Sequence, residues 1–129
     1  MRPAVAQGGR LLAVVEFLAH ARLKSIYEDL GYAVTQEFTV RRAIAQLRRT
    51  PFDVIAADFY FQPDFRDRVS NLESLLAAAQ PHAGTRVLVY HDPAHAEALA
   101  KVRARFRIDA ALTMPVDEAA LSALLQGWR

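Results

Sequence analysis

The sequence predicts one α/β domain in which five parallel strands form a sheet that helices cover on both faces. Five short apolar runs alternate along the chain with five segments of helical periodicity, which is the order of elements in a parallel sheet. Most connections are short, so consecutive elements should pack against one another. The chain has 129 residues, of which 53% are hydrophobic. This is enough for one buried core and leaves little room for a second domain.

The first strand is predicted from residues 11–17 (LLAVVEF), a continuous apolar run typical of a strand buried on both faces. A helix follows, whose apolar residues recur at helical spacing: Leu23, Ile26, Tyr27 and Leu30. Gly31 stands where a glycine commonly ends a helix. Residues 32–38 alternate in polarity and include threonine, glutamine and glutamate, which predicts an edge strand.

The second helix is predicted to begin after Thr39, which can cap it, and to end before Pro51. Its apolar face consists of Val40, Ala43, Ile44 and Leu47. Residues 52–59 (FDVIAADF) are the next buried strand, and the longest connection, residues 60–68, follows at its carboxyl end. A third amphipathic helix carries Val69, Leu72, Leu75, Leu76 and Ala79.

The fourth strand is predicted over residues 85–90 (TRVLVY), and Asp92 followed by Pro93 should start the next helix. The inward residues of that helix are Leu99, Val102 and Phe106. Residues 108–113 form a weaker fifth strand, and Asp117 begins a last helix whose inward residues are Leu121, Leu124, Leu125 and Trp128. The predicted strand order is 2-1-3-4-5, the three-layer, doubly wound, flavodoxin-like form, in which function collects at the carboxyl ends of the strands.

Composition and charge exclude several function classes. The chain has no cysteine, which excludes disulfides, thiolate zinc sites and cysteine nucleophiles. Its net charge of +2 argues against direct nucleic-acid binding, and no apolar run approaches the ~20 residues of a membrane span. Residues 1–9 have no long apolar run, so we expect a flexible N-terminal segment, no signal peptide and a cytoplasmic location.

Four motifs, together with their order along the chain, resemble the response-regulator receiver domain of bacterial two-component systems, the chemotaxis type included. FDVIAADF resembles the family's third strand, which ends in the phosphoacceptor aspartate, here Asp58. LLAVVEF resembles the first strand, which normally ends in two adjacent acids. TRVLVYH resembles the fourth strand, which normally ends in threonine or serine, and LTMP resembles the end of the fifth strand, which normally has lysine–proline. The resemblance covers nearly the whole chain, residues 1–129, as a single domain.

The resemblance also implies which functional residues are missing. In the family, the acceptor aspartate, the second acid of the first strand and a backbone carbonyl hold a divalent cation. Here Glu16 keeps the first acid, but Phe17 stands at the second position, and a phenyl ring cannot ligate magnesium. The lysine position, whose cation pairs with the acyl phosphate, falls on Met114.

Two further positions concern the family's switch. The hydroxyl position falls on Tyr90, or on His91 if the register differs by one, and the aromatic position of the fifth strand falls on Ala111. We hypothesise that the large Tyr90 ring fills the space left beside the small Ala111 and locks the switch in one state. The bond between Met114 and Pro115 is expected to be cis, as the lysine–proline bond of the family often is.

The leading hypothesis is a degenerate receiver, or pseudo-receiver, that signals through protein–protein contact with no cofactor and no enzymatic activity. Asp58 is then a strand-end carboxylate kept polar by solvent and backbone donors. Its partner would be another signalling protein, a fused output domain or a second copy of the chain. One alternative is an atypical phosphoacceptor that uses Asp58 with Glu16, and with Mg²⁺ as cofactor. Another is a small ligand-binding or enzymatic module with a pocket near Glu16, Asp58 and Tyr90.

The candidate partner surface is the face of the fourth helix, fifth strand and fifth helix, with the cations Lys101, Arg103 and Arg105. The second helix carries further arginines, interpreted first as a solvated face and second as a surface for an anionic partner: Arg41, Arg42, Arg48 and Arg49. Isolated histidines at positions 20 and 82 are expected on the surface. The cluster of His91, Asp92 and His95 is expected to supply a loop residue and a helix cap, not a metal site.

Overall fold

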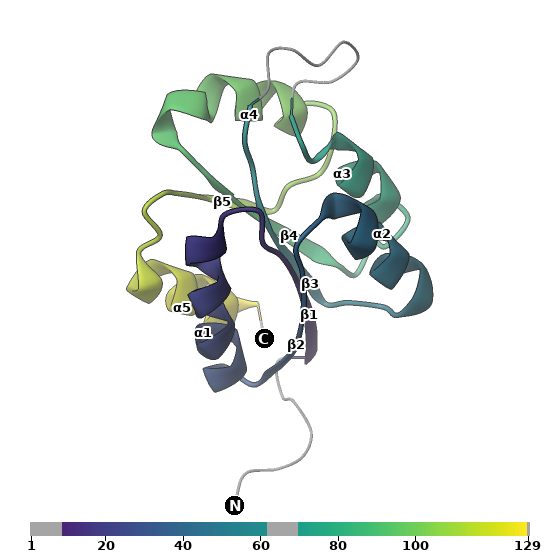
Figure 1. Ribbon diagram of the computed structural model, residues 1–129, viewed down its shortest axis with the longest axis vertical. Helices are drawn as coiled ribbons and strands as arrows, with labels where there is room; N and C mark the ends of the chain where they lie inside the picture. The colour runs from purple at the N-terminus through teal and green to yellow at the C-terminus, as the bar shows by residue number, and fades with distance from the viewer. Residues whose placement is uncertain (1–8, 62–69, 129) are drawn as a thin grey trace, which may run out of the picture.

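The computed structural model describes residues 9–61 and 70–128, and in these residues five parallel strands form one sheet in the order β2-β1-β3-β4-β5 (Figure 1). The predicted fold class and strand order are therefore confirmed. The strands are β1 (Gly9–Val14), β2 (Tyr32–Glu37), β3 (Val54–Asp58), β4 (Arg86–His91) and β5 (Ala110–Thr113).

Helices cover both faces of the sheet (Figure 1). They are the 3₁₀ helix η1 (Leu18–Leu23), α1 (Lys24–Asp29), α2 (Val40–Arg49), α3 (Glu73–Ala79), the 3₁₀ turn η2 (Pro93–His95), α4 (Ala96–Arg103) and α5 (Glu118–Gly127). Side chains of α1 and α5 share one hydrophobic cluster, and those of α2, α3 and α4 share the other. The sheet is thus the middle of three layers.

The central strands are apolar along their whole length because both faces are covered. Successive residues of β1 belong to opposite clusters: Leu11 and Ala13 pack toward α1 and α5, whereas Leu12 and Val14 pack toward the other three helices. All five residues of β3 are buried. This is the continuous hydrophobic pattern expected of a parallel strand inside an α/β fold.

The predicted helix boundaries rest on local chemistry and are confirmed at several positions. The Thr39 hydroxyl accepts a hydrogen bond from the backbone N–H of Arg42 at 3.2 Å. The Asp92 carboxylate accepts one at the start of η2, and Gly31 has a φ of +94°, a conformation that glycine adopts at little cost. The Met114–Pro115 peptide bond is cis, as expected.

Some boundaries differ from the prediction. The first strand begins at Gly9 and ends at Val14, so Glu16 and Phe17 lie in a loop before η1 instead of in the strand. The fifth strand starts at Ala110. Val69, residues 1–8 of the expected N-terminal segment and most of the 60–68 connection lie outside the described residues.

The C-terminal tryptophan is less buried than an inward residue would be. Trp128 is half-buried beside the α1 and α5 cluster, and the guanidinium of Arg86 lies 5.5 Å from the centre of its ring.

We expect the Asp117→Ala substitution to lower the free energy of unfolding by about 1 kcal/mol. The Asp117 side chain accepts hydrogen bonds from the backbone N–H groups of Ala119, at 3.0 Å, and of Ala120, at 3.3 Å. Chemical denaturation followed by circular dichroism measures the change. Asp117→Asn is the matched control because it keeps the acceptor oxygen, and an equal loss in both variants would contradict a capping role.

Candidate functional site

The candidate site lies at the carboxyl edge of the sheet, around the last residue of β3. Asp58 is 1% exposed and stands opposite Tyr90 in the register of β3 and β4. The loop that follows β1 passes directly over its side chain, because the backbone N–H groups of Glu16 and Phe17 point at the carboxylate. The predicted acceptor position is therefore enclosed by the neighbouring loop.

Both carboxylate oxygens of Asp58 already accept hydrogen bonds. Oδ2 accepts from the N–H of Glu16 at 2.9 Å and from the N–H of Phe17 at 3.0 Å, and Oδ1 lies 2.5 Å from Nδ1 of His20. The backbone donors expected around this carboxylate are thus present. Solvent, which was expected to help keep it polar, contributes little at 1% exposure.

His20 is the functional residue that sequence reasoning placed wrongly. It was expected on the surface, yet it is 9% exposed and its Nδ1 atom contacts Oδ1 of Asp58. The reason is the 3₁₀ helix, whose three-residue repeat puts Phe17, His20 and Leu23 on one side of the chain. The apolar residues three positions before and after His20 were the signal that could have found it.

The ring of Phe17 packs over this pair. It makes edge-to-face contacts with the His20 ring, at 6.1 Å between centres, and with the Tyr60 ring, at 5.9 Å. The His20 ring in turn contacts the Tyr90 ring at 5.3 Å. An aromatic cluster therefore occupies the position where the resemblance places the second acidic metal ligand.

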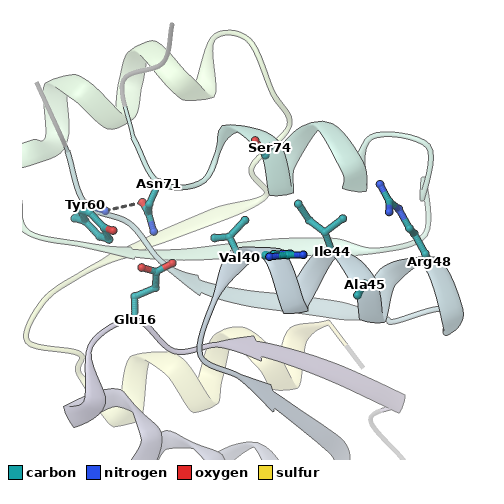
Figure 2. A pocket seen from close by; sticks show the side chains of 9 residues that line it. Glu16, Val40, Ile44, Ala45, Arg48, Tyr60, Asn71 and Ser74 are labelled. Atoms are coloured by element: carbon teal, nitrogen blue, oxygen red, sulfur yellow. Dashed lines mark hydrogen bonds between the residues drawn. The ribbon is translucent and has the colours of Figure 1, made fainter. Parts of the chain in front are cut away.

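The Glu16 carboxylate points toward two residues that the sequence did not single out, Tyr60 and Asn71 (Figure 2). Burial raises the pKa of the Glu16 carboxyl, hydrogen bonds from the Asn71 and Tyr60 side chains oppose that rise, and the charge of Asp58 adds to it. Asn71 also donates to the backbone carbonyl of Asp58 at 2.8 Å and accepts from the N–H of Tyr60 at 3.0 Å. No sequence pattern marks Asn71, since it meets these groups across the long connection.

The donor set does not fit a magnesium ion as a receiver would hold it. Phe17 offers no oxygen, and the oxygens of Asp58 are already bound by two amides and by His20. Among the described residues, no three histidine, aspartate or glutamate side chains lie close enough together to hold a metal ion, and this includes His91, Asp92 and His95. Hard cations need several free oxygen ligands, and the described residues around Asp58 do not supply such a set.

The hypothesis that the Tyr90 ring fills the space beside Ala111 is wrong. Tyr90 is 2% exposed, but it packs toward α1 and α5, and its hydroxyl lies 2.6 Å from that of Tyr27. Ala111 packs against the opposite cluster, because it pairs with Val89, and adjacent residues of a strand face opposite ways. Burial raises the pKa of both tyrosines above the ordinary value of 10.0.

His91, the other candidate for the hydroxyl position, faces the same side of the sheet as Ala111. It is the last residue of β4 and is buried at 7% exposure, instead of lying in a loop. Burial lowers the pKa of its imidazole, and its Nδ1 atom has no hydrogen-bond partner among the described residues. Met114 lies in the wall of a nearby pocket and offers no charge.

Two pockets adjoin Glu16. The first has a volume of about 540 Å³ and lies between α2 and α3 (Figure 2); its lining is Glu16, Val40, Arg41, Ile44, Ala45, Arg48, Tyr60, Asn71 and Ser74. The second, of about 570 Å³, is lined by Glu16, Phe17, Phe59, Tyr60, Asp92, His95 and Met114. A pocket was expected near Glu16, Asp58 and Tyr90. Of these three residues, only Glu16 lines either of the two pockets.

The predicted partner cations near α4 differ in whether they contact other residues of the domain. Lys101 is exposed, but the guanidinium of Arg103 donates to the carbonyl of Ile108 at 3.1 Å, and that of Arg105 pairs with the buried Glu73 at 3.1 Å. Two of the three cations therefore take part in contacts within the domain, and their role in partner binding stays a prediction. His82 is partly exposed.

We expect His20→Ala to lower the free energy of unfolding by about 2–3 kcal/mol, because the buried Asp58 carboxylate would lose a partner and a cavity would form. Urea denaturation measures the loss. His82→Ala, at a histidine with no such contact, is the matched control and should change stability by less than about 0.5 kcal/mol. Equal effects of the two substitutions would contradict the importance of the His20–Asp58 contact.

The raised pKa values predict a loss of stability at high pH. Below pH 10.0 the buried tyrosines are neutral in both the folded and the unfolded chain. Above it the unfolded chain loses these protons first, so the free energy of unfolding falls as pH rises. Comparing the tyrosinate absorbance of the native protein with that of Tyr27→Phe/Tyr90→Phe isolates their ionisation. Ionisation near pH 10.0 in a chain that is still folded would contradict their burial.

No protein-family model matches the sequence, and no curated protein matches it. Solved structures do match. One is a CheY-like response regulator receiver domain protein from Methanospirillum hungatei JF-1, which is 22% identical, with 93% of this chain and 95% of that chain covered and a TM-score of 0.73. Another is the receiver domain of sensor histidine kinase PA1611 from Pseudomonas aeruginosa PAO1, with magnesium in its active-site cleft. It is 17% identical, with 92% and 95% covered and a TM-score of 0.72.

A third similar structure is the chemotaxis response regulator CheY4 of Vibrio cholerae, which is 19% identical, with 94% and 98% covered and a TM-score of 0.67. In the described part of the chain, no helix is long and apolar enough to cross a membrane. At these identities the likeness concerns the fold, and it agrees with the strand order of the sheet. This chain therefore has the fold of a CheY-like response-regulator receiver domain.

Proposed function

We propose that this chain is a degenerate receiver domain that signals through contact with another protein and not through phosphorylation of Asp58. The observation that carries the proposal is the state of the Asp58 carboxylate. It is 1% exposed, and both of its oxygens accept hydrogen bonds from the loop and helix that follow β1.

Phosphoryl transfer to Asp58 would have to displace these donors. A carboxylate acts as a nucleophile through a free oxygen, and the product carries roughly two negative charges. Here one oxygen is held by two backbone amides and the other by His20. With phenylalanine at position 17 and methionine at position 114, neither a metal ligand nor a lysine would stabilise the added charge.

His20 supplies a side-chain partner for the Asp58 carboxylate within the domain itself. Its ring nitrogen satisfies Oδ1 of Asp58, and its ring is held between those of Phe17 and Tyr90. These contacts are all built from the chain itself, so the carboxyl edge keeps one arrangement without a phosphoryl group. Such a domain would act as a constant binding surface, with no cofactor and no enzymatic activity, in the cytoplasm.

The similar structures support a role inside larger signalling proteins. This chain covers 26% of the NtrX chain from Brucella abortus, and it covers 50% of a chain described as a redox sensor of the streptococci that evolved from two-component response regulators. The streptococcal protein is thus described as a redox sensor that evolved from two-component response regulators. A fused output domain or a separate signalling protein is thus the partner we propose.

The competing hypothesis is an atypical acceptor that uses Asp58 and Glu16 with Mg²⁺. The Glu16 carboxyl is available for it only in part, because that carboxyl turns toward Tyr60 and Asn71 (Figure 2). The two hypotheses make opposite predictions about phosphate analogues.

We expect no covalent or analogue adduct on Asp58. After incubation with acetyl phosphate and Mg²⁺, intact-mass spectrometry should show no added phosphoryl group, and ¹⁹F NMR should show no bound beryllofluoride. The matched positive control is the Phe17→Asp/Met114→Lys variant, which restores the metal ligand and the lysine of the family and should gain an Mg²⁺-dependent fluorine signal. An adduct at Asp58 of the unmodified chain, lost in Asp58→Asn, would overturn the proposal in favour of the atypical acceptor.

A further inference from the structure

The arginines of α2 have no acidic partner in the part of the chain that the structure describes. The helix sequence, VRRAIAQLRR, contains no aspartate or glutamate, and all four of its arginines are exposed. By contrast, Arg105 pairs with Glu73 and Arg107 with Asp109. Among the described residues, the largest group of cations without an acidic partner therefore lies on α2 and not on the predicted α4 surface.

Two of the four arginines line a groove and two do not. Arg41 and Arg48, seven residues apart, border the pocket of about 540 Å³ between α2 and α3, whereas Arg42 and Arg49 are absent from its lining. Positions seven apart lie on the same side of a helix. The helix thus presents one pair of cations to the groove and a matched pair outside it.

The floor of the groove is aliphatic. Val40, Ile44 and Ala45 lie along it on α2, with Ser74 of α3 on the opposite wall (Figure 2). Glu16 lies at one end, and Arg48 lies toward the other. A groove with an apolar floor and a cation at its border suits a chain segment that carries both aliphatic and acidic side chains.

Other ligand classes fit these features less well. A small inorganic anion would leave the aliphatic floor unused. A nucleic acid would bring a continuous line of phosphates past the carboxyl group of Glu16 and would leave the aliphatic side chains of Val40 and Ile44 unused. The charge balance of the whole chain, +2, also favours a local contact over a general attraction to polyanions.

We propose that the groove between α2 and α3 binds an acidic amphipathic segment of a partner protein, with its carboxylates on Arg41 and Arg48 and its aliphatic side chains on Val40 and Ile44. The inference rests on the proposed function, since it names the surface through which a constant signalling domain meets its partner. It places that surface on α2, whereas the sequence favoured the face of α4, β5 and α5 and gave the α2 arginines a partner role only as a second interpretation.

The test compares two charge-reversal variants of the full chain. The probe is a short fluorescein-labelled peptide, with glutamate and leucine at helical spacing, and its binding is followed by fluorescence anisotropy. Arg41→Glu/Arg48→Glu should weaken binding about tenfold or more, whereas Arg42→Glu/Arg49→Glu, with the same charge change on the same helix, should weaken it far less. Circular dichroism melting of each variant checks that it is folded.

A third variant separates the groove from charge alone. Ala45→Trp fills the exposed floor without changing any charge, and it should also abolish peptide binding. Amide chemical shifts in the unmodified chain should change on α2 and α3 when the peptide is added. A peptide with lysine in place of glutamate should not bind.

Several outcomes would overturn the inference. These are equal losses in the two arginine pairs, a loss on Lys101→Glu with none on Arg41→Glu/Arg48→Glu, undiminished binding in Ala45→Trp, or no peptide binding at all. Binding of a single-stranded DNA oligonucleotide through Arg41 and Arg48, without peptide binding, would assign the groove to nucleic acid instead. Because none of these outcomes involves Asp58, the beryllofluoride result would still decide the proposed function by itself.

Discussion

The buried carboxylate of Asp58 is the group around which the carboxyl edge of the sheet is organised. Its oxygens bind two consecutive N–H groups of the loop after β1 and the imidazole of His20. A carboxylate at 1% exposure would be very costly without such donors. These contacts therefore hold the loop down, start η1 at Leu18 and place the Phe17 ring over the site.

The residues around Asp58 at this edge form one packed cluster of aromatic rings and hydroxyl groups. The aromatic rings of Phe17 and Tyr90 both contact the His20 ring, and the Tyr90 hydroxyl is hydrogen-bonded to that of Tyr27 on α1. These contacts are all made by side chains of the domain itself, and the proposal of a domain that signals without phosphorylation depends on them.

Charge is distributed unevenly between the helices, and the local sequence does not reveal the difference. Both α2 and the segment around α4 are rich in arginine, so both are candidate partner surfaces by composition. In the folded chain, Arg103 and Arg105 contact Ile108 and Glu73, whereas the α2 arginines have no acidic partner among the described residues. A cation that is already paired within the domain is less available to bind a partner. For this reason the proposed binding groove lies along α2.

The sequence by itself determined the five strands, their order, the helix caps at Thr39, Asp92 and Asp117, and the glycine that ends α1. These depend on periodicity and on hydrogen bonds between residues close together in the chain. Only the tertiary structure decided that His20 contacts Asp58 and that Tyr90 and Ala111 face opposite ways. His20 and Asp58 are 38 residues apart, and Tyr27 and Tyr90 are 63 apart, so the packing of distant elements sets these contacts. The first strand was expected to end at Phe17, but it ends at Val14 and a short 3₁₀ helix starts at Leu18. This helix places His20, which was predicted to lie on the surface, against the Asp58 carboxylate.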